Sequence, residues 1–247
     1  ENTYTGNTRV TAGTLTLGHA SAIAGSTLDL AAADAGTVAF GAPTTYTLGG
    51  LEGTRDLNMG GNTLAMGANG QSTEYGGSLS NGSLVKTGAG TLTLSGTNTH
   101  NATIISEGNL KFLTDANLGA AGAGITLDGG TLQYDVAAWN YSVSRPITLT
   151  DDSYLLGGGN SLRLSGKISD GTDSFGLTLM DGYVSLTNSA NDYDGATIVA
   201  DGGFYVGANG ALGTTNGATF VEGSGILTVD TNYATPETLH LNGGVIR

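Results

Sequence analysis

Short runs of alternating apolar and polar residues recur along the whole chain. Leu, Val, Ile and Met take every second position, and Thr, Ser, Asn or Asp stands between them. This period of two predicts half-buried β-strands, because successive side chains of a strand point to opposite faces. Gly or Asn separates the runs, as tight turns require. The clearest predicted strands are residues 13–17, 27–30, 37–40, 45–48, 56–59, 63–66, 83–85 and 91–94.

One block of the sequence recurs three times. Each copy opens on an Asn, passes through a Tyr or His, and reaches a Thr before the next strand. The aligned threonines stand 95 and 94 residues apart, so the copies cover approximately residues 1–85, 86–178 and 179–247. At roughly 20–25 residues per coil, such a unit would hold about four coils of a solenoid. The Asn positions are Asn2, Asn98 and Asn191, and the Thr positions are Thr8, Thr103 and Thr197.

Two architectures accommodate strands this short and closely spaced: a sandwich or barrel, and a β-helix. Internal repetition favours the β-helix, since sandwiches seldom repeat internally. The inward Leu, Ile and Val residues would then stack on themselves from coil to coil. The sequence therefore predicts an all-β protein, a single-stranded parallel β-helix that is continuous over residues 1–247.

Composition narrows the class further. Gly supplies 43 of the 247 residues and charged residues only 12%, which disfavours helices. The net charge of −13 makes nucleic acid a poor partner. There is no Cys, so disulfide and thiolate chemistry are excluded. We expect no transmembrane segment in this chain. Because the sequence opens inside the repeat pattern and carries no leader, we expect it to be part of a longer protein.

A family resemblance follows from residues 85–99. They read Val-Lys-Thr-Gly-Ala-Gly-Thr-Leu-Thr-Leu-Ser-Gly-Thr-Asn-Thr. This segment resembles the core of the autotransporter-associated β-strand repeat, also called the passenger-associated repeat, and residues 2–6 and 12–17 match further parts of it. The third copy departs at residues 179–187. The resemblance implies a right-handed parallel β-helix on the bacterial cell surface or outside the cell. No catalytic residue belongs to this repeat, so none is carried over and no enzyme is expected.

Polysaccharide-degrading enzymes also use parallel β-helices, and they need clustered carboxylates with a His and a basic residue nearby. The only adjacent acidic pair is Asp151-Asp152, which we interpret as turn residues. The three histidines lie far apart in the sequence. His100 takes the repeat position that Tyr4 and Tyr193 occupy, which indicates a structural substitution. An enzyme of this kind is therefore the remote alternative.

Two groups of residues remain as candidate binding sites. Aspartates could supply oxygen ligands to Ca²⁺, although they do not match a calcium nonapeptide, and no other cofactor is indicated. Aromatic residues gathered in one segment could stack on a glycan or could pack the interior. The calcium candidates are Asp170, Asp173, Asp192 and Asp194, and the glycan candidates are Tyr134, Trp139 and Tyr141.

These observations favour a structural function: a stalk or fibre segment of an exported, adhesin-like bacterial surface protein. Each coil of a solenoid buries the face of the next, and neither end shows an obvious cap. The expected partners are therefore adjacent solenoid segments or copies of the same chain, stacked end to end into a filament. The alternative is an adhesin module that binds glycans or a host surface.

Overall fold

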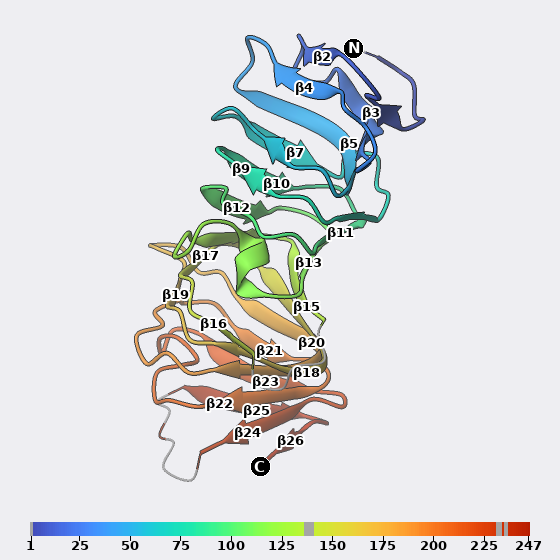
Figure 1. Cartoon of the computed structure of the whole chain (residues 1–247). Helices are drawn as coiled ribbons and strands as arrows, with labels where there is room; N and C mark the ends of the chain where they lie inside the picture. Colours follow the sequence, from blue (N-terminus) through green and yellow to red (C-terminus); the bar gives the residue numbers. More distant parts are fainter. Residues whose placement is uncertain (1, 136–140, 231–233, 235–236) are drawn as a thin grey trace. The chain divides into compact units, whose positions relative to one another are not determined.

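The structure is a computed structural model, and it describes residues 2–135, 141–230, 234 and 237–247. The chain divides into two compact units, Glu1–Ala123 and Gly124–Arg247, and each is described by itself. In both units, short strands stack on one another as parallel coils (Figure 1). The predicted parallel β-solenoid is therefore confirmed. A single continuous solenoid over residues 1–247 stays a prediction.

In the first unit, strands one coil apart pair in parallel. Ser83 pairs with Thr63 on one side and with Ala102 on the other, so three coils are in register. The strands are β1 (Thr8–Arg9), β2 (Thr14–Leu17), β3 (Ile23–Leu30), β4 (Thr37–Phe40), β5 (Thr45–Gly53), β6 (Leu57–Asn58), β7 (Thr63–Met66), β8 (Thr73–Tyr75), β9 (Leu79–Ser80), β10 (Ser83–Lys86), β11 (Thr91–Leu94), β12 (Ala102–Ile105) and β13 (Asn109–Phe112).

A short 3₁₀ helix, η1 (Asp115–Leu118), follows β13. The Asn117 Oδ1 accepts hydrogen bonds from the backbone N–H groups of Leu113 and Thr114, which fixes this turn. Leu118, the last residue of this helix, is buried. In the part of the chain that the structure describes, no helix has the length and apolar character needed to cross a bilayer.

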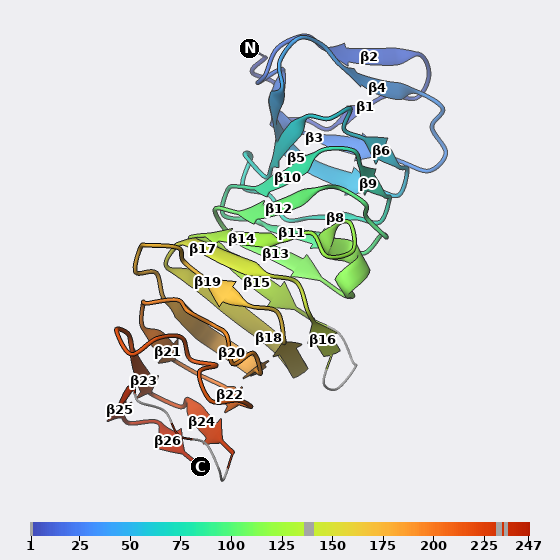
Figure 2. The same ribbon diagram turned by 90° about the vertical axis from the view of Figure 1, so that its left-hand side faces the viewer.

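The second unit repeats the same arrangement. Leu149 of one coil pairs with Leu127 of the coil before it, and Ile147 pairs with Ile168 of the coil after it (Figure 2). The strands are β14 (Ile125–Asp128), β15 (Thr131–Tyr134), β16 (Tyr141–Val143), β17 (Ile147–Asp151), β18 (Ser153–Leu164), β19 (Ile168–Ser169), β20 (Leu177–Leu186), β21 (Thr197–Val199), β22 (Gly203–Val206), β23 (Ala218–Glu222), β24 (Ile226–Val229), β25 (Thr238–Asn242) and β26 (Val245–Ile246).

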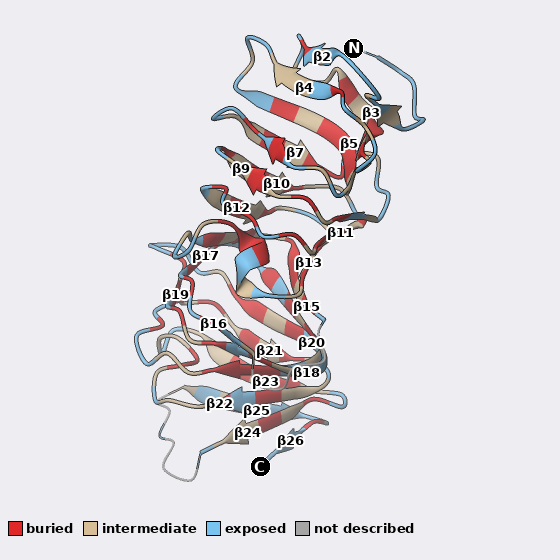
Figure 3. Cartoon of the chain, viewed as in Figure 1, coloured by how far each residue is buried: buried red, intermediate tan, exposed pale blue. Residues whose placement is uncertain are grey.

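The core consists of columns of inward side chains. Within a column, every side chain comes from a different coil. Strands β7 and β10 to β13 alternate strictly between intermediate and buried residues, as the period of two predicts (Figure 3). In the second unit, Leu162, Val184, Phe204 and Leu227 form one such column. Burying a large apolar side chain stabilises the fold by about 1.5–3 kcal/mol. Each apolar side chain that is buried in a column therefore stabilises the packing of its coil on the next.

Some strands are longer than the uniform four to five residues that we predicted. β5 has 9 residues, β20 has 10 and β18 has 12. Each of these strands contains Gly residues, which let the backbone bend through a corner of the coil without leaving the sheet. In β18 the register shifts between Leu155 and Leu156, where the strand approaches Gly157.

Candidate functional site

The Asn that opens each repeat ties its own coil to the neighbouring coils. Asn98 is 2% exposed; its Oδ1 accepts a hydrogen bond from the Leu79 N–H at 2.7 Å. Its Nδ2 donates to the Asn117 carbonyl at 2.6 Å. Leu79 and Asn117 each lie 19 residues from Asn98, which is one coil in either direction. One side chain therefore holds three successive coils together.

The third copy makes both contacts, and the first copy makes one of them. In the third copy, the Ile168 N–H donates to Asn191 Oδ1 at 2.8 Å, and Asn191 Nδ2 donates to the Ala211 carbonyl at 2.7 Å. In the first copy, the exposed Asn2 donates through Nδ2 to the Ala22 carbonyl at 2.8 Å. We call this set the Asn ladder: Asn2, Asn98 and Asn191.

The aromatic residue and the Thr of each repeat form a second recurring contact. Tyr193 OH and Thr197 Oγ1 lie 2.7 Å apart and are buried. His100 Nε2 and Thr103 Oγ1 lie 2.8 Å apart, also buried. The first copy has the same pair, Tyr4 OH and Thr8 Oγ1, at 3.1 Å on the surface. His100 thus replaces Tyr and keeps its hydrogen bond, which confirms its structural interpretation.

Lys86 of the repeat motif occupies a core column rather than the surface. Its register partners are Met66 and Ile105, both fully buried, and Lys86 is itself 1% exposed. Its Nζ donates to the carbonyls of Thr87 at 2.7 Å, Gly88 at 2.6 Å and Glu107 at 3.1 Å. The ammonium therefore caps three carbonyls of two successive coils. Burial lowers the pKa of Lys86 to about 8, against the opposing effect of the Glu107 carboxylate.

Lys86 gives the fold a pH dependence. Because its pKa is lower in the folded state, the unfolded chain binds more protons between pH ~8 and ~10.4, and stability rises with pH in that window. Between pH ~7.5 and ~9.5, we expect the unfolding free energy to rise by about 1–2 kcal/mol relative to the variant Lys86→Met. Urea unfolding of both proteins at several pH values measures the difference. A constant difference across the window would contradict the prediction.

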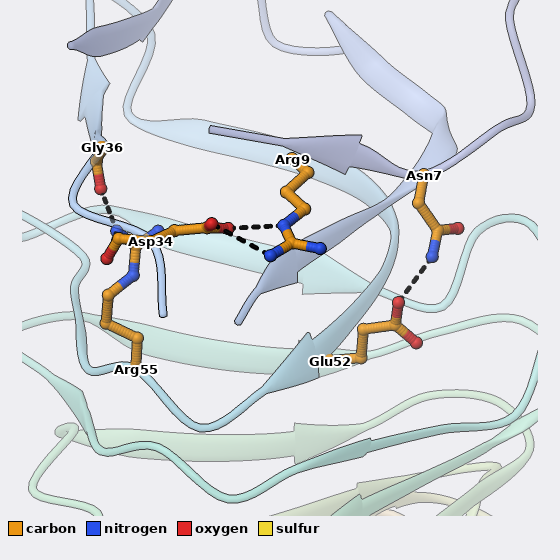
Figure 4. Close-up of polar contacts among 6 residues, drawn as sticks. All are labelled: Asn7, Arg9, Asp34, Gly36, Glu52 and Arg55. Carbon is orange, nitrogen blue, oxygen red and sulfur yellow. Dashed lines mark hydrogen bonds and ion pairs between the residues drawn. The ribbon is translucent and has the colours of Figure 1, made fainter. Parts of the chain in front are cut away.

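Other polar contacts join coils at the start of the first unit (Figure 4). Arg9 forms a two-pronged ion pair with Asp34, at 2.7 and 3.0 Å. Asn7 donates to Glu52 at 2.5 Å, and Arg55 donates to the Gly36 carbonyl. The hydrogen bond from Arg9 holds the pKa of Asp34 below its ordinary value. Each of these contacts joins residues of different coils.

Three of the four calcium candidates link turns or coils. Asp170 Oδ2 accepts from the N–H groups of Phe175 and Asp194, while its buried Oδ1 has no hydrogen-bond partner. Asp192 pairs with Lys167 at 2.6 Å. Asp194 accepts from Thr214, which lowers its pKa. Asp173 is exposed. Among the described residues, no three His, Asp or Glu side chains gather into a possible metal site.

The glycan candidates have different environments. Tyr134 is fully buried, so its ring is not accessible to a sugar in this structure. Tyr141 is partly exposed and stacks on Tyr134, with ring centroids 5.3 Å apart. Trp139 lies outside the described residues. Tyr134 thus follows the packing interpretation, and glycan contact in this segment stays a prediction.

The acidic pair lies where a turn was predicted. Asp151 ends β17 and Asp152 precedes β18, and both are exposed. Asp151 Oδ1 accepts from the Asp152 N–H at 2.8 Å, and Asp152 Oδ1 accepts from the Gly176 N–H at 2.7 Å. Both carboxylates therefore have structural roles at a corner of the coil.

Comparison with known proteins agrees with this geometry. The model of the passenger-associated-transport-repeat matches residues 1–27, 84–112 and 181–204. Each of these segments contains one of the three aligned threonines. The chain contains passenger-associated transport repeats. The residues of the Asn ladder and Lys86 all lie within the matched segments.

One curated relative extends the comparison. The chain is 41% identical over 91 residues to the adhesin BmaC autotransporter of Brucella suis biovar 1 (strain 1330). The match covers 36% of this chain and 3% of that adhesin's length. No solved structure matches the chain.

Proposed function

We propose that this chain is a stalk segment in the passenger of an exported bacterial surface protein of the adhesin type. The observation that carries the proposal is the Asn ladder, because the repeated residue links one coil to its neighbours. A device of this kind serves any number of coils and needs no ligand. The passenger-associated transport repeats and the similarity to an autotransporter adhesin support the exported location.

The positions that recur in this chain are used for internal contacts. The Asn ladder and Lys86 bind neighbouring coils, and the aromatic–Thr pairs join residues three or four positions apart within one coil. Catalytic groups would instead have to converge on a reacting atom. The acidic pair Asp151-Asp152 lies at a corner of the coil, and its carboxylates accept hydrogen bonds from backbone N–H groups. A spacer function therefore accounts for the repeated residues better than an enzymatic function does.

The stalk proposal predicts an extended particle in solution. If the repeats continue as one solenoid, small-angle scattering of the purified chain should give the cross-section of a single coil stack and a much larger maximum dimension. Sedimentation velocity over a range of concentrations checks for end-to-end association, since open ends of a solenoid can pair with another copy. A compact particle that stays monomeric at all concentrations would contradict both the stalk and the filament.

A further inference from the structure

A groove of about 760 Å³ lies on the outer surface of the second unit, over strands β18, β20, β22 and β24. Its wall includes Ser161 and Arg163, then Tyr183 and Ser185 one coil on, and Tyr205 one coil further. A groove binds small polar molecules when its wall combines apolar faces with a few polar contacts. None of these residues has a role in the contacts shared by the repeats.

Two exposed tyrosines form the apolar part of the groove. Tyr183 is 50% exposed and Tyr205 is 40% exposed, although both stand on sheet positions with buried neighbours. Each ring lies against a glycine. A Cβ added at Gly203 would meet Tyr183 Cδ1 at 2.5 Å, and one added at Gly207 would meet Tyr205 Cε1 at 3.1 Å. The glycines let both rings lie close to the sheet surface, one coil and two residues apart.

Arg163 gives the groove its charge. It is exposed, and its Nε donates to Thr187 Oγ1 at 3.1 Å, which holds the guanidinium at the groove wall. This differs from Arg9 and Lys167, whose charges are neutralised by Asp34 and Asp192. Arg247 also lines the groove, and no Asp or Glu is among its lining residues. A basic groove in a chain of net charge −13 is complementary to an anionic ligand.

A second hollow in the same unit provides a contrast. It measures about 410 Å³ and includes the exposed Tyr154, but its wall carries Asp152 and Asp194. An anionic ligand would be repelled there. Each hollow thus contains a surface tyrosine of its own, and the two differ in the sign of their charge.

We propose that the groove around Tyr183 and Tyr205 binds a carboxylated saccharide. The tyrosine rings would stack on the apolar faces of the sugar. The guanidinium of Arg163 would donate hydrogen bonds to the carboxylate, with the planar geometry that suits this group. Ser161 and Thr228 also line the groove and would contact the sugar hydroxyls. The site does not depend on the stalk function, and either can fail while the other holds.

Calorimetric titration of the whole chain tests the site. The probes are hexagalacturonate, representing uronate polysaccharides, and 3′-sialyllactose, representing host glycans, with methyl-esterified hexagalacturonate and lactose as uncharged counterparts. We expect at least one acidic probe to bind and its uncharged counterpart to bind more weakly. Arg163→Gln and Tyr205→Ala should each raise the Kd about tenfold, the effect of one lost charged or stacking contact. Which probe binds identifies the source of the saccharide.

The matched control is Tyr154→Ala, which removes an equally accessible tyrosine from the acidic hollow and should leave the Kd unchanged. Thermal unfolding of all variants shows whether the fold is intact, and Arg163→Gln keeps the packing even if Tyr205→Ala does not. The proposal is overturned if neither acidic probe binds, if Tyr154→Ala weakens binding as much as Tyr205→Ala, or if the groove variants change only self-association of the chain.

Discussion

Replacing Asn98 with Ala is expected to lower the unfolding free energy by about 2–6 kcal/mol. The substitution leaves the Leu79 N–H and the Asn117 carbonyl without their partner inside the fold. A buried polar group that loses its hydrogen bond costs about 1–3 kcal/mol, and here two groups lose theirs. Urea unfolding followed by circular dichroism measures the effect.

Asn2→Ala is the matched control, because Asn2 holds the same repeat position on the surface. Water can replace its hydrogen bond, so the loss should stay below about 0.5 kcal/mol. The variant Asn98→Asp keeps the acceptor for Leu79 but buries a carboxylate against the Asn117 carbonyl, so at neutral pH it should be at least as destabilising as Asn98→Ala. Equal losses for Asn98→Ala and Asn2→Ala would show that the ladder does not hold the coils together.

The strands could be predicted from the sequence because a single physical rule governs them. Residues 63–66 and 91–94 form β7 and β11 with the predicted bounds, since the period of two decides which side chains are buried. The repeat alignment also placed Asn98 and His100 correctly as equivalents of the residues in the other copies. Local pattern and internal repetition were sufficient for these features.

The groove could not be predicted in the same way. It depends on which residues of different coils become neighbours, and coil length varies: Thr91 pairs with Asn109, 18 residues on, whereas Thr14 pairs with Thr37, 23 residues on. Arg163, Ser185 and Tyr205 therefore share a column that no fixed spacing reveals. One signal was present, because Tyr205 stands between the inward Phe204 and Val206 and so had to face outward.

Lys86 shows the opposite case. The alternation of inward and outward positions indicates that it is buried, whereas its residue type suggests an exposed position. It stands two residues after the inward Leu84, so the period of two places it in the core. A lysine is rarely buried unless its charge is satisfied. The three carbonyls that accept from Nζ provide that compensation, and they come from turns whose course is set by the whole coil.

The second large loss of stability is expected where two coils approach each other closely at a glycine. Gly182 lies in β20 with a φ of +83°, and a Cβ there would overlap the carbonyl of Gly157 in the preceding coil. Gly182→Ala should therefore cost about 1–2 kcal/mol for the left-handed backbone and about 1–3 kcal/mol more for the forced separation of the coils. We expect a total loss of about 2–5 kcal/mol, measured by the shift in the urea midpoint.

Gly171→Ala separates the two contributions. Gly171 has a similar φ of +74°, but no atom lies within 4 Å of the position that its Cβ would take. Only the backbone cost of about 1–2 kcal/mol should then appear. The difference between the two variants measures how tightly β18 and β20 are stacked. If Gly182→Ala were no more destabilising than Gly171→Ala, the coils could move apart without loss. Column packing would then contribute little to the rigidity that a stalk requires.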